Sequence, residues 1–157
     1  MTYTTQKHKY QAYAAATQTV AKTQQIIMLY DGVIKLIQQA KDAINERRIE
    51  DRYNLLLKAS NIIHGLQGCL DFEQGGEIAN VLFSFYSSID NRLFSVQRTN
   101  SLESCDEVIA DLKQMRDAWA SVDSQLLDNV APKPPAPPSA DAAQPAPVSP
   151  SGVTLSA

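Results

Sequence analysis

The sequence predicts an all-α protein: an antiparallel up-down-up-down four-helix bundle with a short N-terminal segment and a disordered C-terminal tail rich in proline and alanine. Three observations support this fold class. All 8 prolines lie from Pro132 onward, so no proline interrupts a helix before that point. Between residues 20 and 128, apolar residues recur at the three- and four-residue spacing of helices in four separate runs. The alternation of apolar and polar residues that marks strands is absent.

Composition divides the 157-residue chain into three parts. We expect a mobile N-terminal segment over residues 1–19, a bundle over 20–130 and a tail over 131–157. The tail holds 8 Pro, 7 Ala and 4 Ser in 27 residues, so it lacks the apolar surface that would offset the entropy of ordering it. Within the N-terminal segment, residues 8–18 have the composition of a short extra helix that lies weakly attached on the bundle.

The first two helices follow from two apolar stripes and the polar stretch between them. The first stripe runs from Ile26 to Ile44 and ends at the polar residues 45–52. Asp51 is the predicted N-cap of the second helix, because a short carboxylate there accepts hydrogen bonds from the first free backbone N–H groups. The second stripe extends from Tyr53 to Leu70.

The last two helices are separated by glycine, serine and asparagine signals. Gly75 and Gly76 are predicted to form a helix stop and turn, because glycine adopts positive φ angles without strain. The third stripe then runs from Ile78 to Val96. Ser101 is the predicted N-cap of the fourth helix, whose apolar face runs from Val108 to Leu126.

Short connections between helices of about 30–39 Å require that neighbouring helices lie antiparallel. Each amphipathic helix is marginally stable alone in water and gains stability by burying its stripe against the others. The four runs therefore predict one bundle with one core.

The charge distribution excludes general nucleic-acid binding. The net charge is −3; residues 1–58 carry 9 Lys or Arg and 5 Asp or Glu, whereas residues 103–128 carry 2 and 7. Neither run forms the concentrated basic surface that nucleic acid requires, and both are typical of solvated helix faces.

The sequence also predicts a cytoplasmic protein without membrane insertion, since it has neither the apolar core of a signal peptide nor 18 consecutive apolar residues. Cys69 and Cys105 have no CxxC spacing and no histidine close by. We therefore expect buried thiols in a reducing compartment, with no disulfide, metal or cofactor.

Catalytic motifs are absent, so the chain is not predicted to be an enzyme. The di-iron motif Glu-x-x-His is missing, because Thr5 and Asn61 stand three residues before the two histidines. One alternative uses His64, since residues 64–68 resemble the His-x-Leu-Lys-Gly stretch of histidine phosphotransfer domains, which are also four-helix bundles. Gln67 replaces the lysine that offsets the phosphoryl charge there.

The helices contain more large apolar residues than one core can hold. Adjacent residues on a helix point about 100° apart, so runs of neighbouring apolar residues cannot all face inward. These runs are Ile26 to Leu29, Leu55 to Leu57, Ile62-Ile63 and Val81 to Phe83. Two interpretations remain open at this point: wide stripes buried by the bundle and a docked N-terminus, or an apolar surface groove for a partner segment.

A set of fragments in characteristic order and spacing covers residues 10 to about 125. The fragments are Tyr10-Gln11, Thr19, Ile26 to Gly32, Asn54-Leu55, Lys58-Ala59, Ile62-Ile63, Leu66, Leu70-Asp71, Gly75 to Ala79, Leu82, Tyr86 and Ala118-Trp119. Together they resemble the flagellar secretion chaperone family, FliS. The chain departs from the common pattern at Lys22, where a proline is frequent, and at Thr23 and Gln25.

The resemblance implies a cytoplasmic, non-enzymatic export chaperone. Such a protein binds the C-terminal segment of flagellin, prevents premature polymerisation and aids delivery to the export gate of the flagellar type III apparatus. An alternative is a generic helical adaptor that binds another client. The sequence also leaves open whether the protein binds a second regulator or co-chaperone, and whether it is a monomer or a weak dimer.

The resemblance also suggests partner-binding residues. Tyr10, with Tyr13, is expected to form a reversible cover over the client groove. The candidate groove residues are the excess apolar positions Leu55, Leu57, Ile62 and Val81, together with Tyr30 and Tyr86. The alternative for each is packing in the core, which is the expectation for Leu66, Leu70 and Trp119. Gly32 is expected at a close helix crossing.

Overall fold

The computed structural model describes residues 3–130, without the side chains of residues 3–10, 13, 129 and 130. This range forms four helices, α1 (Tyr3–Asn45), α2 (Ile49–Gly68), α3 (Phe72–Thr99) and α4 (Leu102–Val130), and contains no strand. The predicted all-α fold class is confirmed. The predicted tail, residues 131–157, lies outside the described residues.

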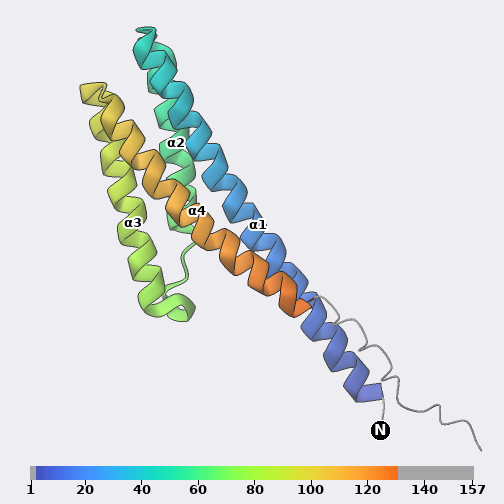
Figure 1. Ribbon diagram of the computed structural model, residues 1–157. Helices are drawn as coiled ribbons and strands as arrows, with labels where there is room; N and C mark the ends of the chain where they lie inside the picture. Colours follow the sequence, from blue (N-terminus) through green and yellow to red (C-terminus); the bar gives the residue numbers. More distant parts are fainter. Residues whose placement is uncertain (1–2, 131–157) are drawn as a thin grey trace, which may run out of the picture.

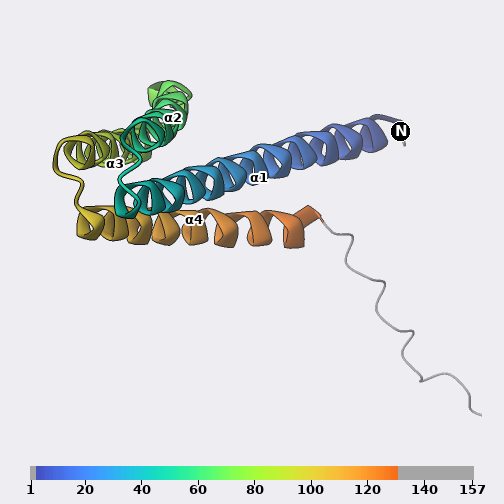
Figure 2. The ribbon, with the colours of Figure 1, turned by 90° about the horizontal axis from the view of Figure 1, so that it is seen from above.

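The helices run alternately up and down (Figure 1), as the sequence predicted. α1 packs against both α2 and α4, and α3 closes the ring by packing against α2 and α4. α1 and α4 run side by side along most of their lengths, whereas the shorter α2 packs against only the C-terminal part of α1 (Figure 2).

Two ion pairs show the register of α1 against α4. Arg116 Nε lies 3.0 Å from Asp31 Oδ1, and Lys41 pairs with Asp106. The ten residues from Asp31 forward to Lys41 along α1 therefore match the ten residues from Arg116 back to Asp106 along α4, as antiparallel helices require. Since α4 ends 14 residues beyond Arg116, its end lies level with residue 17 of α1. Residues 3–16 of α1 thus extend beyond the helix beside them.

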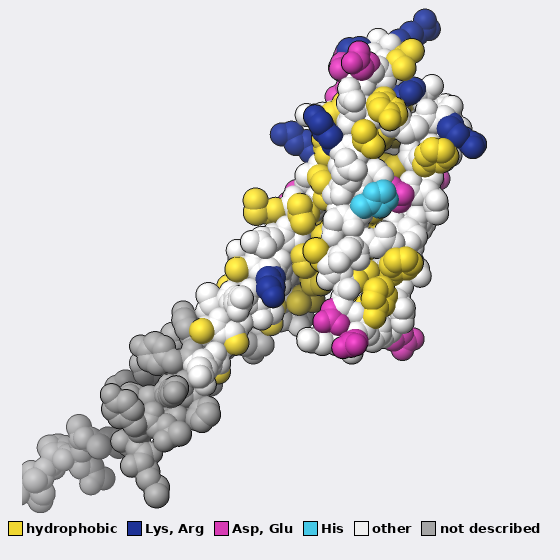
Figure 3. All heavy atoms as spheres, turned by 180° about the vertical axis from the view of Figure 1, so that it is seen from behind, with side chains coloured by type: hydrophobic (Ala, Val, Ile, Leu, Met, Phe, Trp, Pro, Cys, Tyr) yellow, Lys and Arg dark blue, Asp and Glu magenta, His cyan; other side chains and the backbone are white. Residues whose placement is uncertain are grey.

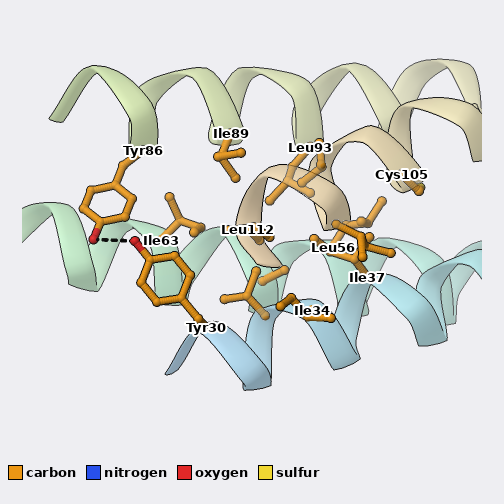
Figure 4. Close-up of a cluster of buried hydrophobic side chains, with 14 of the residues drawn as sticks. Tyr30, Ile34, Ile37, Leu56, Ile63, Tyr86, Ile89, Leu93, Cys105 and Leu112 are labelled. Carbon is orange, nitrogen blue, oxygen red and sulfur yellow. Dashed lines mark hydrogen bonds between the residues drawn. The ribbon is translucent and has the colours of Figure 1, made fainter. Parts of the chain in front are cut away.

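The core consists of the inward-facing stripes of all four helices (Figure 4). It is built mainly from aliphatic side chains with almost no exposed surface, and burial of this kind is the main favourable contribution to folding. Its largest fully buried members are Tyr30, Tyr86, Ile37, Leu56, Ile63, Ile89, Leu93 and Leu112.

The N-terminal residues differ from expectation. α1 runs without a break from Tyr3 to Asn45, so residues 8–18 continue this helix instead of forming a separate one. No proline or glycine lies between Tyr3 and Asp31, and the alanines at 14–16 are strong helix formers. Local propensity therefore carries the helix through the predicted boundary at residue 20.

The connection between α1 and α2 also differs from prediction. α2 begins at Ile49 with Arg48 in the N-cap position and without a side-chain cap. Asp51 lies in the first turn instead, where its carboxylate pairs with Arg48 and favours the positive end of the helix dipole. The N-cap prediction for Asp51 is wrong.

The turn between α2 and α3 comes earlier than predicted. α2 ends at Gly68, and α3 begins at Phe72 after Asp71, whose carboxylate accepts two backbone N–H bonds of 3.0 Å. Gly76 does have positive φ (50°), but it forms a kink inside α3. The glycines thus redirect a helix that has already started, which corrects the predicted stop.

The connection between α3 and α4 follows the prediction. Asn100 ends α3 in the left-handed conformation, with φ of 56°. Ser101 caps α4, because its Oγ accepts the N–H of Ser104 at 3.1 Å. No described helix is long and apolar enough to cross a membrane.

Candidate functional site

An apolar groove lies between α1 and α2, at the end of the bundle where α2 meets α3. Its cavity has a volume of about 590 Å³. Ile26 and Leu29 of α1 form one wall, and Ile62 and Leu66 of α2 form the other. The remaining lining residues are Lys22, Gln25, Gly65 and Cys69.

A second cavity, of about 370 Å³, continues this groove under the start of α3. The two cavities share Ile26, Leu66 and Cys69, so they form one apolar surface, which we call the α1–α2 groove. The second cavity is lined further by Leu70, Asp71, Gln74, Gly75, Ile78, Ala79, Leu82, Tyr86 and Trp119. Residues from all four helices therefore contribute to the groove.

The kink in α3 shapes this end of the groove. Gly76 has φ of 50° and ψ of −125°, which only glycine adopts readily. A Cβ atom on Gly75 would lie 2.9 Å from Cβ of Ala79, so glycine is required there for lack of space. The turn formed by these glycines leaves Ile78 71% exposed at the groove edge.

A pair of tyrosines lies at the inner end of the groove. The Tyr30 hydroxyl donates to the Tyr86 hydroxyl over 2.9 Å, joining α1 to α3 (Figure 4). We call these two residues the tyrosine pair; both side chains are buried. Burial, reinforced by the hydrogen bond to Tyr86, raises the pKa of Tyr30 above its ordinary value, and a nearby Trp119 N–H offsets part of that rise. Burial likewise raises the pKa of Tyr86.

The structure exposes some of the candidate groove residues. Leu57 and Val81 are exposed, as the excess of apolar residues predicted. Leu55 and Ile62 are half-buried and pack against the core. Of these four residues, only Ile62 lines the α1–α2 groove.

The remaining candidates include buried residues and residues whose side chains are not described. Tyr30 and Tyr86 are core residues, with exposures of 0% and 2%, and Tyr86 also lines the second cavity of the groove. The side chains of Tyr10 and Tyr13 lie outside the described residues. Gly32 is not at an unusually close crossing, because a Cβ there would meet Ile62 Cδ1 at an ordinary 4.0 Å.

Several groove residues were not predicted from the sequence. Leu29 and Ile78 are exposed there, and Leu66 and Trp119, expected only in the core, also line the cavities. Cys69 was expected to be buried but is exposed, whereas Cys105 is buried as predicted. The run from Ile26 to Leu29 did indicate that some of its residues are exposed, because four successive apolar residues on a helix cannot all face inward.

A second, separate apolar surface lies between α2 and α3. Its cavity of about 380 Å³ is bordered by Tyr53, Leu57 and Phe94, and all three side chains are exposed. Figure 3 shows hydrophobic side chains above and below the histidine on this face. We call this surface the α2–α3 face; Leu57 belongs to it and not to the groove.

The α2–α3 face also contains the phosphotransfer candidate. His64 is exposed, but its Nε2 lies 3.0 Å from Asp90 Oδ2. The Asp90 carboxylate also accepts the Ser60 hydroxyl. A carboxylate beside the ring nitrogen would repel a phosphoryl group, and the lysine of the motif is missing. This arrangement disfavours a phosphoacceptor role.

The described residues contain no group of three His, Cys, Asp or Glu side chains that could hold a metal ion. What the fold offers is an apolar groove, open at the surface of a four-helix bundle and wide enough for side chains of another segment. The geometry defines a class of four-helix bundles with an open apolar groove.

Sequence comparison identifies the family within this class. The family model described as "Flagellar protein FliS" matches residues 5–126, and the chain belongs to this family. The flagellar secretion chaperone FliS of Campylobacter jejuni is 32% identical over 114 residues, covering 72% of this chain and 89% of the relative. That of Escherichia coli is 31% identical, covering 69% and 85%. This is a family of chaperones, not of enzymes.

A solved structure supports the fold independently. The crystal structure of a bacterial flagellar chaperone superposes with a TM-score of 0.62 at 19% identity, covering 69% of this chain and 85% of the other. The shared architecture is the four-helix bundle.

Proposed function

We propose that this chain binds the C-terminal segment of flagellin in the cytoplasm, prevents its premature polymerisation and aids its delivery to the flagellar type III export apparatus. The observation that carries the proposal is the α1–α2 groove of this member of the family. Leu29 and Ile78 are exposed along the groove, although the core beside it is well filled. Large apolar side chains gathered along one groove are typical of a surface that a partner covers.

The groove has dimensions that suit a helix. Along α1 it extends from Lys22 to Leu29, which is about 10 Å or two helical turns. An amphipathic client helix places anchors at i, i+3 or i+4, and i+7 along such a length. Contacts of this kind compete with the packing of the same client face in a filament.

Reversible binding also fits this surface. A client segment that is disordered before binding must be ordered on the chaperone, which offsets several kcal/mol of the contact free energy. The complex therefore remains dissociable at the export gate even with a large interface. Interactions with the gate or with a second regulator, and monomeric or weakly dimeric states, are compatible with this arrangement.

The N-terminal cover now requires a conformational change. Tyr10 and Tyr13 lie within α1 itself, and residues 3–16 of this helix extend past the end of α4. Covering the groove would require α1 to bend or unwind near residue 20. We therefore expect a cover to form only at the expense of backbone hydrogen bonds at that point.

A matched pair of variants tests the groove. Leu29→Asp places a charge in the α1–α2 groove, whereas Phe94→Asp places one on the α2–α3 face; both side chains are exposed, so both variants should fold. Calorimetry with the host's flagellin should show at least about tenfold weaker binding for Leu29→Asp, since one buried leucine contributes about 1.5–3 kcal/mol. Phe94→Asp should bind as the parent chain does.

Flagellin without its C-terminal segment supplies the client control. A one-to-one complex that this truncation abolishes would establish the client and its binding end. Absence of binding to either flagellin would exclude the flagellin proposal and leave a helical adaptor for another client. We also expect weak dependence on salt, because apolar contacts are not screened. A hundredfold loss at high salt would instead indicate docking on the acidic α4.

A further inference from the structure

The α1–α2 groove and the end of the described chain lie at the same end of the bundle. α4 ends level with residue 17 of α1, and the groove extends along α1 from Lys22 to Leu29. The axial separation is 5 to 12 residues, or about 8–18 Å at 1.5 Å per residue. Along the bundle axis, whatever follows Val130 therefore starts within about 8–18 Å of the groove.

The chain that follows contains a short apolar stretch at a suitable distance. Its larger aliphatic residues are Val148, Val153 and Leu155, and all three lie within residues 148–157. The 18 residues from Val130 to Val148 would span about 23 Å as a flexible coil and about 56 Å as polyproline helix. Either value exceeds the axial distance to the groove.

We propose that residues 148–157 dock in the α1–α2 groove of the same molecule and cover it until a client displaces them. In an extended chain, residues two apart project to the same side, so Val153 and Leu155 enter the groove together. There they meet the apolar walls formed by Ile26, Leu29, Ile62 and Leu66.

Tethering makes such a weak segment effective. Three aliphatic side chains bury little surface, so the segment on its own would bind with low affinity. A tether of this length raises the local concentration of the segment to about the millimolar range, which suffices for partial occupancy. Partial occupancy shields the exposed apolar walls without preventing a tighter client from binding. The docking needs no flagellin, whereas its competition with flagellin rests on the proposed function.

Cys69 makes the docking directly measurable. Its thiol is exposed and lines both cavities of the groove, while Cys105 is buried and will not compete for oxidant. In the full chain, Thr154→Cys places a second thiol between the two proposed anchors. Ser139→Cys is the matched control, nearer the bundle but outside the docking segment.

Disulfide formation with Cys69 in a glutathione redox buffer then reports contact. We expect the bond to form at least about fivefold faster from position 154 than from position 139, and this preference to vanish in urea. Adding Val153→Ser and Leu155→Ser to the Thr154→Cys chain should reduce the rate to that of the control. Equal rates from positions 154 and 139 in native buffer would overturn the docking.

Flagellin binding tests the consequence separately. The full chain with Val148, Val153 and Leu155 all changed to Ser should bind the C-terminal segment of flagellin about two- to fivefold more tightly than the parent. Unchanged affinity would overturn the competition. If the disulfide forms preferentially from position 154 but neither chain binds flagellin, the docking stands and the proposed client is wrong.

Discussion

Changing Tyr86 to Phe should destabilise the fold more than the loss of one hydrogen bond would suggest. The variant removes the acceptor of the 2.9 Å hydrogen bond from Tyr30, whose side chain has 0% exposure. With Tyr86 changed, the Tyr30 O–H loses the hydrogen bond that it donates in the core. A buried polar group without a partner costs about 1–3 kcal/mol, whereas a formed hydrogen bond contributes about 0.5–1.5 kcal/mol.

The double variant Tyr30→Phe with Tyr86→Phe separates these two contributions. It removes both hydroxyls and keeps the shape of the core, so neither tyrosine hydroxyl is left buried without the other. We expect each single change to lower the free energy of unfolding by about 1–3 kcal/mol. The double change should cost about 1–3 kcal/mol less than the sum of the two singles.

Urea unfolding of the four proteins, followed by circular dichroism at neutral pH, measures the cycle. The slope against urea should stay constant across the set, which shows that the same surface is exposed in each case. A coupling of zero between the two changes would refute the reasoning, because the hydroxyls would then stabilise the fold independently of each other.

Three further predictions concern pH, the kinked helix and a buried carboxylate. Burial raises the pKa of both members of the tyrosine pair in the folded state. Their contribution to stability should therefore be fully present below pH 10 and decline above it. In urea titrations at alkaline pH, the free energy of unfolding of the double Phe variant should decline less than that of the parent chain. Gly75→Ala should lower the free energy of unfolding by about 1–3 kcal/mol because its Cβ has no space, whereas Gly65→Ala, with no atom within 4 Å, should raise it by about 0.4–1 kcal/mol in thermal melts. Asp123 is buried and its Oδ1 has no partner within the described chain, so Asp123→Ala should stabilise by about 1 kcal/mol more than the exposed control Asp117→Ala; equal effects in urea unfolding would exclude a desolvation cost.

The two apolar surfaces give the molecule distinct faces. The α1–α2 groove connects all four helices and continues toward the tyrosine pair, while the α2–α3 face has a polar centre formed by His64, Asp90 and Ser60. A charge placed on one face should therefore leave binding at the other unchanged. This independence makes Leu29→Asp and Phe94→Asp a meaningful comparison.

The sequence predicted the bundle well because helices are specified locally. Four apolar stripes, free of proline, gave the number and order of helices, and Ser101 marked the start of α4 correctly. Boundaries set by weaker signals were less accurate. Asp51 has the chemistry of an N-cap but lies within the first turn of α2, since Arg48 already occupies the cap position.

The sequence by itself determined the fold class, the family and the presence of surplus apolar surface. Only the tertiary structure decided which residues form the groove. Periodicity defines a stripe on each helix, but the rotation of that helix against its neighbours selects which edge of the stripe stays open. Rotation buries Tyr30 and Tyr86 and places Leu57 on the α2–α3 face. The groove itself depends on the path of the chain at Gly76, where a positive φ redirects α3 beside Leu66 and Trp119.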